Sequence, residues 1–302
     1  MAKTKTPFLS LGSQGTVGGV LTSQKRGGDT ILRRTPRPTD PYSLRQAYQR
    51  WDYRDYAYLW TLLSNSEKQI YRTRGSRYHI TGFSQYMREQ LKTLPDLLGR
   101  WHLDELSGAT AYDSSKQTNN GTIIGASPTT GRIAGAYYFD GLNDKVLLPS
   151  LPLFDLPAQA TIEFFYTFQE SVPAITNYYI FQYGRTNQYG WEIRVELGDT
   201  LRFLTSQAAA VQASRSNVIP LGTHHYAITR DDAVVTFFQD AQDITAVHGV
   251  HIQPAPSLTP PKFASNHDDS QWGKGILDHF VYYNRVCDLT EIKRHSERRY
   301  PL

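Results

Sequence analysis

The spacing of hydrophobic residues changes along the chain, and the change falls near residue 98. Between residues 41 and 97, apolar and aromatic side chains recur every three or four positions, which is the period of an amphipathic helix. Leu44, Tyr48, Trp51, Tyr58 and Leu62 lie on one such stripe. The pattern predicts one helix over about 43–62 and two shorter helices over 64–74 and 83–91.

Residues that cap helix N-termini support two of these helices. Ser43 is followed three positions later by Gln46, and Ser64 by Glu67, which is the spacing of a capping box. Three short helices within residues 41–97 bury little surface of their own. We therefore expect this segment to need the preceding arm or another partner for stability.

From residue 98 onward, short β-prone runs alternate with turn signals and no helical pattern separates them. Many short strands in succession favour an antiparallel sandwich or barrel. The expected strands cover residues 136–139, 146–148, 161–168, 178–183, 191–197, 201–205, 224–229, 234–238 and 276–283.

The first forty residues are polar and interrupted by glycine and proline. Two β-prone runs, at 16–22 and 30–32, flank Lys25-Arg26-Gly27-Gly28, which predicts a hairpin because glycine tolerates positive φ. We expect an extended basic arm at 1–40, a small helical anchoring unit at 41–97 and a mainly β, antiparallel sandwich or barrel at 98–302.

The composition excludes several classes of structure. The chain has 302 residues and one cysteine, Cys287, so it forms no internal disulfide and no zinc site built from four cysteines. It contains no apolar run long enough to span a membrane, and its first thirty residues lack the apolar stretch of a signal peptide. We expect synthesis in the cytoplasm of a host cell and no membrane insertion.

Charge is distributed unevenly along the chain. Residues 1–100 contain 17 basic and 7 acidic side chains, whereas residues 101–302 contain 15 basic and 21 acidic ones. A basic segment favours an anionic partner. Because the arm mixes β-prone residues with its charges, we expect docking on other protein subunits rather than on nucleic acid. The predicted docking residues are Arg26, Arg33, Arg34, Arg37, Arg45, Arg50 and Arg54.

Four sequence motifs in the second part of the chain resemble those of a known family. In order, they cover residues 99–105 (GRWHLDE), 111–122 (with AYDSS and NNGT), 135–146 (GAYYFDGLNDKV) and 275–292. Their order and spacing resemble those of concanavalin A-like, laminin-G-like domains of the type that includes pentraxins. The resemblance implies a mainly β, antiparallel jelly-roll sandwich at 98–302. Two positions depart from the family pattern, His279 and the pair Val286-Cys287. The first hundred residues, with Ser84, Tyr86 and Arg88, resemble small modules of bacteriophage virion proteins.

The resemblance implies a calcium site in the loops of the sandwich. Calcium binds clustered oxygen ligands, although Asp and Asn are also common turn residues. Both interpretations stay open for the oxygen-rich positions of the motifs, which are Asp113, Asp140, Asn143, Asp144 and Asp278.

Aromatic residues of the sandwich are candidates for sugar stacking, with core packing as the alternative. These residues are Tyr183, Tyr189, Trp191 and Trp272. A glycosidase site is a weaker hypothesis. Glu192 and Glu196 share one strand face, but Arg194 occupies the position where a third acid is needed. We therefore expect no enzymatic activity.

Together these patterns favour a structural protein of a virus or phage particle: a capsid decoration, spike or adhesion component. Residues 1–97 would dock on virion or capsid subunits in a multi-copy assembly, and the lectin-like sandwich would face a cell-surface glycan. A virion protein needs no export signal, because it reaches the outside by assembly and lysis. The alternative is a cellular carbohydrate-binding lectin with an N-terminal attachment module.

Overall fold

The computed structural model describes residues 43–298 except 151, 175 and 209, together with strands at residues 3–4, 15–17, 21–26 and 29–34. The chain divides into two compact units, Met1–Ser43 and Leu44–Leu302. Each unit has its own secondary structure.

The first unit contains a four-stranded antiparallel sheet in the order β1-β4-β3-β2. β3 and β4 pair with Arg26 opposite Asp29, so the predicted hairpin is present. The segment that we expected to be an extended arm thus contains a sheet. Its strands are β1 (Lys3–Thr4), β2 (Gly15–Val17), β3 (Leu21–Arg26) and β4 (Asp29–Arg34).

The second unit begins with the three predicted helices, α1 (Leu44–Leu62), α2 (Asn65–Ser76) and α3 (Gly82–Thr93). The capping box of Ser64 and Glu67 starts α2, as its spacing predicts. The Thr81 side chain caps α3, and Leu94 ends it in the left-handed conformation, with φ of 46°.

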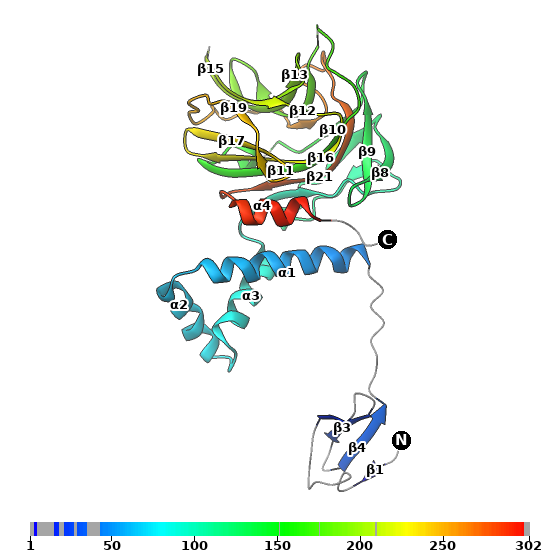
Figure 1. The fold of residues 1–302 in the computed structure, drawn as a ribbon, viewed down its shortest axis with the longest axis vertical. Coiled ribbons are helices and arrows are strands. Elements are labelled where there is room, and N and C mark those ends of the chain that lie inside the picture. Colours follow the sequence, from blue (N-terminus) through cyan, green and yellow to red (C-terminus); the bar gives the residue numbers. More distant parts are fainter. Residues whose placement is uncertain are drawn as a thin grey trace. The chain divides into compact units, whose positions relative to one another are not determined.

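Two antiparallel sheets then form the predicted sandwich (Figure 1). One sheet has the order β19-β15-β14-β13-β12-β20-β10-β7-β6, and its strands are β6 (Thr110–Ala111), β7 (Gly121–Ile124), β10 (Lys145–Leu147), β12 (Tyr178–Arg185), β13 (Tyr189–Glu196), β14 (Thr200–Gln207), β15 (Ala210–Val218), β19 (Thr245–Val247) and β20 (Lys262–Phe263). A short 3-10 helix, η1 (Pro152–Phe154), follows β10.

The other sheet has the order β18-β17-β16-β11-β21-β9-β8, and β5 also pairs with β21. Its strands are β5 (Leu97–Trp101), β8 (Ser127–Gly131), β9 (Ala134–Asp140), β11 (Gln159–Phe168), β16 (Gly222–Asp231), β17 (Val234–Gln239), β18 (Gln242–Asp243) and β21 (Lys274–Tyr283). The final helix, α4 (Leu289–Ser296), lies beneath this sheet, between it and α1 (Figure 1).

Aromatic rings fill the space between the two sheets. Phe280 of β21 lies at the centre, with ring-centroid distances of 5.5 Å to Phe181, 5.8 Å to Phe164 and 4.7 Å to Phe263. Trp101 is fully buried beside them. Rings at these separations stabilise a core beyond the area they bury, so the sandwich has a strong hydrophobic centre.

A second hydrophobic cluster joins the helices to the outer face of the β21 sheet. Tyr56 and Tyr86 come from the helices, and Val281 and Tyr283 come from β21. The expected boundary at residue 98 is therefore not a break in packing, and Leu44–Leu302 forms one compact unit. The separate roles that we expect for 41–97 and 98–302 remain predictions.

Candidate functional site

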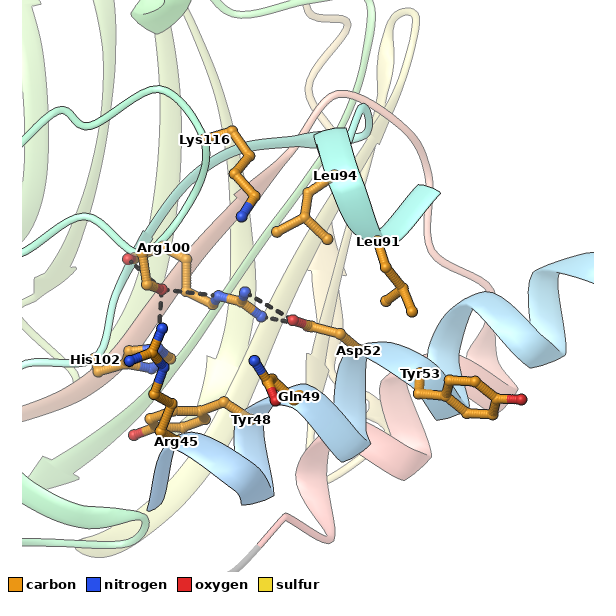
Figure 2. Close-up of a pocket in the computed structure, with 11 residues that line it drawn as sticks. Arg45, Tyr48, Gln49, Asp52, Tyr53, Leu91, Leu94, Arg100, His102 and Lys116 are labelled. Atoms are coloured by element: carbon orange, nitrogen blue, oxygen red, sulfur yellow. Dashed lines mark hydrogen bonds and ion pairs between the residues drawn. The ribbon is translucent and has the colours of Figure 1, made fainter. Parts of the chain in front are cut away.

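A pocket of about 540 Å³ lies where α1, the end of α3 and β5 meet. Figure 2 shows its walls: one comes from α1, another from Leu91 and Leu94, and a third from β5 and the loop that follows β6. The pocket thus joins the helices to the sandwich, and neither part forms it alone.

A buried ion pair forms the floor of this pocket. The Arg100 guanidinium donates to both carboxylate oxygens of Asp52, at 2.6 and 3.1 Å, and its Nε donates to Ser114 Oγ at 3.0 Å. The side chains of Arg100 and Asp52 are only 6% and 16% exposed. Burial alone would lower the pKa of Arg100, but Asp52 outweighs burial and raises it. This bidentate pair holds α1 against β5.

Next to this pair, Tyr48 and two histidines form a stack. The Tyr48 and His102 rings lie 3.5 Å apart between centroids, with an angle of 10° between their planes. His102 Nδ1 lies 2.9 Å from His279 Nδ1, and His102 Nε2 lies 2.8 Å from Ser114 Oγ. Burial lowers the pKa of both histidines well below the usual value, so both are neutral at pH 7. They add no charge to the pocket.

The pocket rim carries positive charge. Arg45 and Lys116 are both exposed, and Figure 2 shows Arg45 rising from α1 beside His102 and Lys116 pointing into the pocket from the loop that follows β6. Among the residues that the structure describes, neither has an ion-pair partner. Because Asp52 already balances Arg100, the pocket keeps an excess of positive charge and is suited to an anionic group.

A separate ionic network fixes α1 and α4 to the sandwich. The buried Glu163 of β11 lies 2.8 Å from His295 Nδ1 and 3.3 Å from His225 Nε2. Asp55 of α1 pairs with Arg298 and lies 3.4 Å from His295 Nε2. Burial and Arg298 would lower the pKa of His295, but Glu163 and Asp55 raise it to about 9. The network is therefore charged at neutral pH, and it holds α1 and α4 against the sandwich.

The predicted calcium ligands lie at different places. Asp113 closes its own loop, since its carboxylate accepts bonds from the amides of Arg100, Ser115 and Asn119 at 2.8 to 2.9 Å. Asp140, Asn143 and Asp144 share one turn, where Asp144 accepts from the Asp140 amide at 2.9 Å.

The fifth predicted ligand, Asp278, accepts from the Ile133 amide at 2.9 Å, and burial raises its pKa to about 7. Within residues 43–298, apart from the gaps given above, no three His, Cys, Asp or Glu side chains form a group that could hold a metal. The geometry favours the turn interpretation, and calcium binding remains a prediction.

Two of the predicted sugar-stacking residues lie in the core instead. Tyr183 and Trp191 are each 2% exposed, so neither offers an open ring face, which corrects that expectation. Tyr183 donates to Asp155, and the Trp191 indole donates to the Phe154 carbonyl at 2.7 Å. Tyr189 and Trp272 are half-buried, and sugar stacking on these two remains a prediction.

Glu192 and Glu196 of β13, the two acids considered for a glycosidase site, form ion pairs within their own strand. Arg194 lies between Glu192 and Glu196 and pairs with both. Glu192 is 2% exposed, and it also accepts from Thr186 at 2.6 Å. The two carboxylates are therefore held by Arg194 rather than aimed at an open site.

The predicted docking arginines divide between the two units. Arg45, Arg50 and Arg54 are exposed on α1, and the last two line a second hollow of about 440 Å³ with Tyr53. Arg26 and Arg33 lie on β3 and β4, Arg34 is exposed, and Arg37 lies outside the described residues.

The pocket residues from the sandwich were missed by the sequence analysis. Arg100 and His102 belong to the GRWHLDE motif, and Ser114 and Lys116 follow directly after the Asp113 turn. The polar and basic residues inside these motifs were the available signal. Their pairing with α1 depends on contacts across more than forty residues of chain.

No helix in the described part of the chain is both long and apolar enough to cross a membrane.

Comparison with solved structures shows what the sandwich is similar to. The binding domain of Paraclostridial Mosquitocidal Protein 1 matches with a TM-score of 0.51 and 16% identity over 66% of this chain and 51% of that chain. A mutant of HCR/D matches with a TM-score of 0.52 and 9% identity over 67% and 52%. The chain thus spans about half the length of these proteins, and at such identity the likeness shows the fold alone. No curated protein matches the chain.

The expectation that the protein is not an enzyme is wrong, because the fold does not rule out enzymatic activity. A mutant of Trypanosoma rangeli sialidase displaying trans-sialidase activity matches with a TM-score of 0.50 and 16% identity, over 66% of this chain and 32% of that chain. An enzyme chain therefore contains this sandwich, and the fold cannot exclude catalysis. The same low identity assigns no activity to this chain.

The sequence profile of the concanavalin A-like lectin/glucanases superfamily matches residues 139–293, which is just over half of the chain. This segment runs from the end of β9 to α4 and contains most of both sheets. The match confirms the fold that the sequence motifs predict, and the chain belongs to the concanavalin A-like lectin/glucanases superfamily.

Proposed function

We propose that the protein is an adhesion component of a virus or phage particle. Its basic N-terminal part attaches to other particle subunits, and its lectin-like sandwich recognises a glycan. The observation that carries this proposal is the division of the chain into two compact units, Met1–Ser43 and Leu44–Leu302. Such a division suits a protein that attaches with one part and binds with another.

Charge supports attachment by the first unit. Residues 1–43 contain seven Lys and Arg side chains against two Asp. A small basic sheet with short strands can add to the sheet edge of a neighbouring subunit or dock on its acidic surface. Many copies on one particle would make weak individual contacts sufficient for adhesion.

The second unit supports the recognition role. It belongs to a superfamily of lectins and glucanases, and it carries a pocket with polar and apolar walls. Pockets of this kind are the usual places for small ligands.

Two measurements test the proposal together. Particles from the virus or phage that carries this sequence are purified on a density gradient and probed with an antibody against the full chain. The full-length protein is also applied to an array of neutral and acidic glycans. We expect the protein in the particle fraction and binding on the array.

Each outcome is informative. Glycan binding by a protein that is absent from particles would overturn the virion role and favour a cellular lectin with an attachment module. Presence on particles without glycan binding would overturn the recognition role. Replacing Arg33 and Arg34 with Gln should weaken particle association, whereas Lys293→Gln, an exposed substitution on α4, should not.

A further inference from the structure

We propose that the pocket between α1 and β5 binds a saccharide that carries a carboxylate group. This inference rests on the proposed glycan recognition, and it names the site and the class of sugar. It is carried by the charge, the size and the chemical character of the pocket walls, which come from residues far apart in the sequence.

The net positive charge of the pocket favours a negatively charged ligand. Asp52 is the acidic residue among the described residues that line it, and it is already bound at 2.6 Å by Arg100. Arg45 and Lys116 remain, both exposed at the rim and without an ion-pair partner in the described part of the chain. An arginine fork on α1 and a lysine on the loop after β6 both favour a carboxylate in the pocket that they line.

The remaining walls suit a sugar ring. Leu91 and Leu94 provide an apolar side, which matches the C–H face of a pyranose. Gln49 lies on the opposite wall, from α1, and its amide can both donate to and accept from hydroxyl groups. The cavity volume of about 540 Å³ falls within the range of about 300–1,000 Å³ that small-ligand sites occupy.

The pocket is not formed by the segment that matches the superfamily profile. Its lining residues lie between residues 45 and 116, whereas the superfamily profile matches residues 139–293. The wall from α1 and α3 belongs to helices that precede the sandwich. A sugar bound here would therefore contact the helices and the sandwich together.

A matched pair of probes tests the proposal. Glucuronic acid and glucose differ only at C6, where glucuronic acid has the carboxylate. Each is titrated into the full-length, isotope-labelled protein and followed by NMR, at low and at high salt. We expect glucuronic acid to bind at least about tenfold more tightly than glucose, because a charge-assisted contact contributes about that factor or more. Added salt should reduce the difference.

Variants place the binding in this pocket. Arg45→Gln combined with Lys116→Gln should lower affinity for glucuronic acid at least about tenfold, and Lys116→Arg should retain most of it. The matched control replaces an exposed arginine and an exposed lysine elsewhere, Arg215→Gln with Lys293→Gln, and should leave affinity unchanged. All four positions are exposed, so thermal unfolding should confirm that each variant folds.

The results separate this inference from the proposed function. Array binding that survives Arg45→Gln with Lys116→Gln would overturn the pocket assignment and leave glycan recognition standing. Equal affinity for glucose, or equal affinity for inorganic phosphate, would overturn the carboxylate-sugar specificity. Failure of every glycan on the array, together with failure of glucuronic acid, would overturn both proposals.

Discussion

Replacing Asp52 tests whether the ion pair beneath the pocket holds the helices to the sandwich. Asp52 and Arg100 are 16% and 6% exposed, and their side chains meet through two hydrogen bonds of 2.6 and 3.1 Å. At an effective dielectric constant of about 20, opposite charges about 4 Å apart attract by about 4 kcal/mol. Removing one partner of a buried pair costs about 3–5 kcal/mol, because the other charge is left buried and unpaired.

We expect Asp52→Ala to lower the free energy of unfolding by about 3 kcal/mol, at the low end of that range because Asp52 is partly exposed. The double variant Asp52→Ala with Arg100→Met should lose less than the sum of the two single variants, because no unpaired charge remains. Urea unfolding, followed by tryptophan fluorescence, measures these values.

Hydrogen exchange resolves where the loss occurs. If the pair holds the helix, the amides of α1 should lose more protection in Asp52→Ala than those of β11 and β21, which exchange only on global unfolding. A loss below about 0.5 kcal/mol, the size of a typical surface substitution, would refute the reasoning. Additive effects of the two single variants would refute it as well.

Three further predictions concern the ionic network around His295, the close packing of Gly99 against Trp101, and the buried hydroxyl of Tyr183. Because the folded pKa of His295 is raised to about 9, its contribution to stability should be full below about pH 6.5 and decline as pH rises to 9; His295→Gln should remove this decline from the pH profile of the urea midpoint. Gly99→Ala should destabilise by about 1–3 kcal/mol in thermal unfolding, because a Cβ there would lie 2.3 Å from Trp101; an unchanged midpoint would contradict this. Tyr183→Phe should cost about 1–2 kcal/mol, since the Ser257 carbonyl and Asp155 lose a donor, and it should leave glycan binding unchanged.

Local patterns predicted the elements well, because each depends on residues close in sequence. The period of Leu44 to Leu62 identifies α1, and Ser64 with Glu67 marks the start of α2. The order of four short motifs indicates the sandwich, which the superfamily match confirms.

Side-chain environments could not be predicted in the same way. Tyr183 and Trp191 share a strand pair with exposed and half-buried residues, and only the second sheet decides that their rings face inward. The pairing of Asp52 with Arg100 joins positions 48 residues apart. No local pattern encodes which helix face meets which strand, so the polar and basic residues of the motifs could not be assigned to a pocket from the sequence alone.

The shared cluster of helices and sheet has a consequence for dissecting this protein. Shortening the chain to begin at residue 98 would leave Val281 and Tyr283 of β21 open to water, and it would remove Asp52, the carboxylate that pairs with the buried Arg100. Such a fragment would expose an apolar surface and contain a charged side chain without its ion-pair partner. We expect it to aggregate rather than behave as a minimal lectin module. A cut near residue 43, where the first compact unit ends in the sequence and the second begins, is the division that the packing permits.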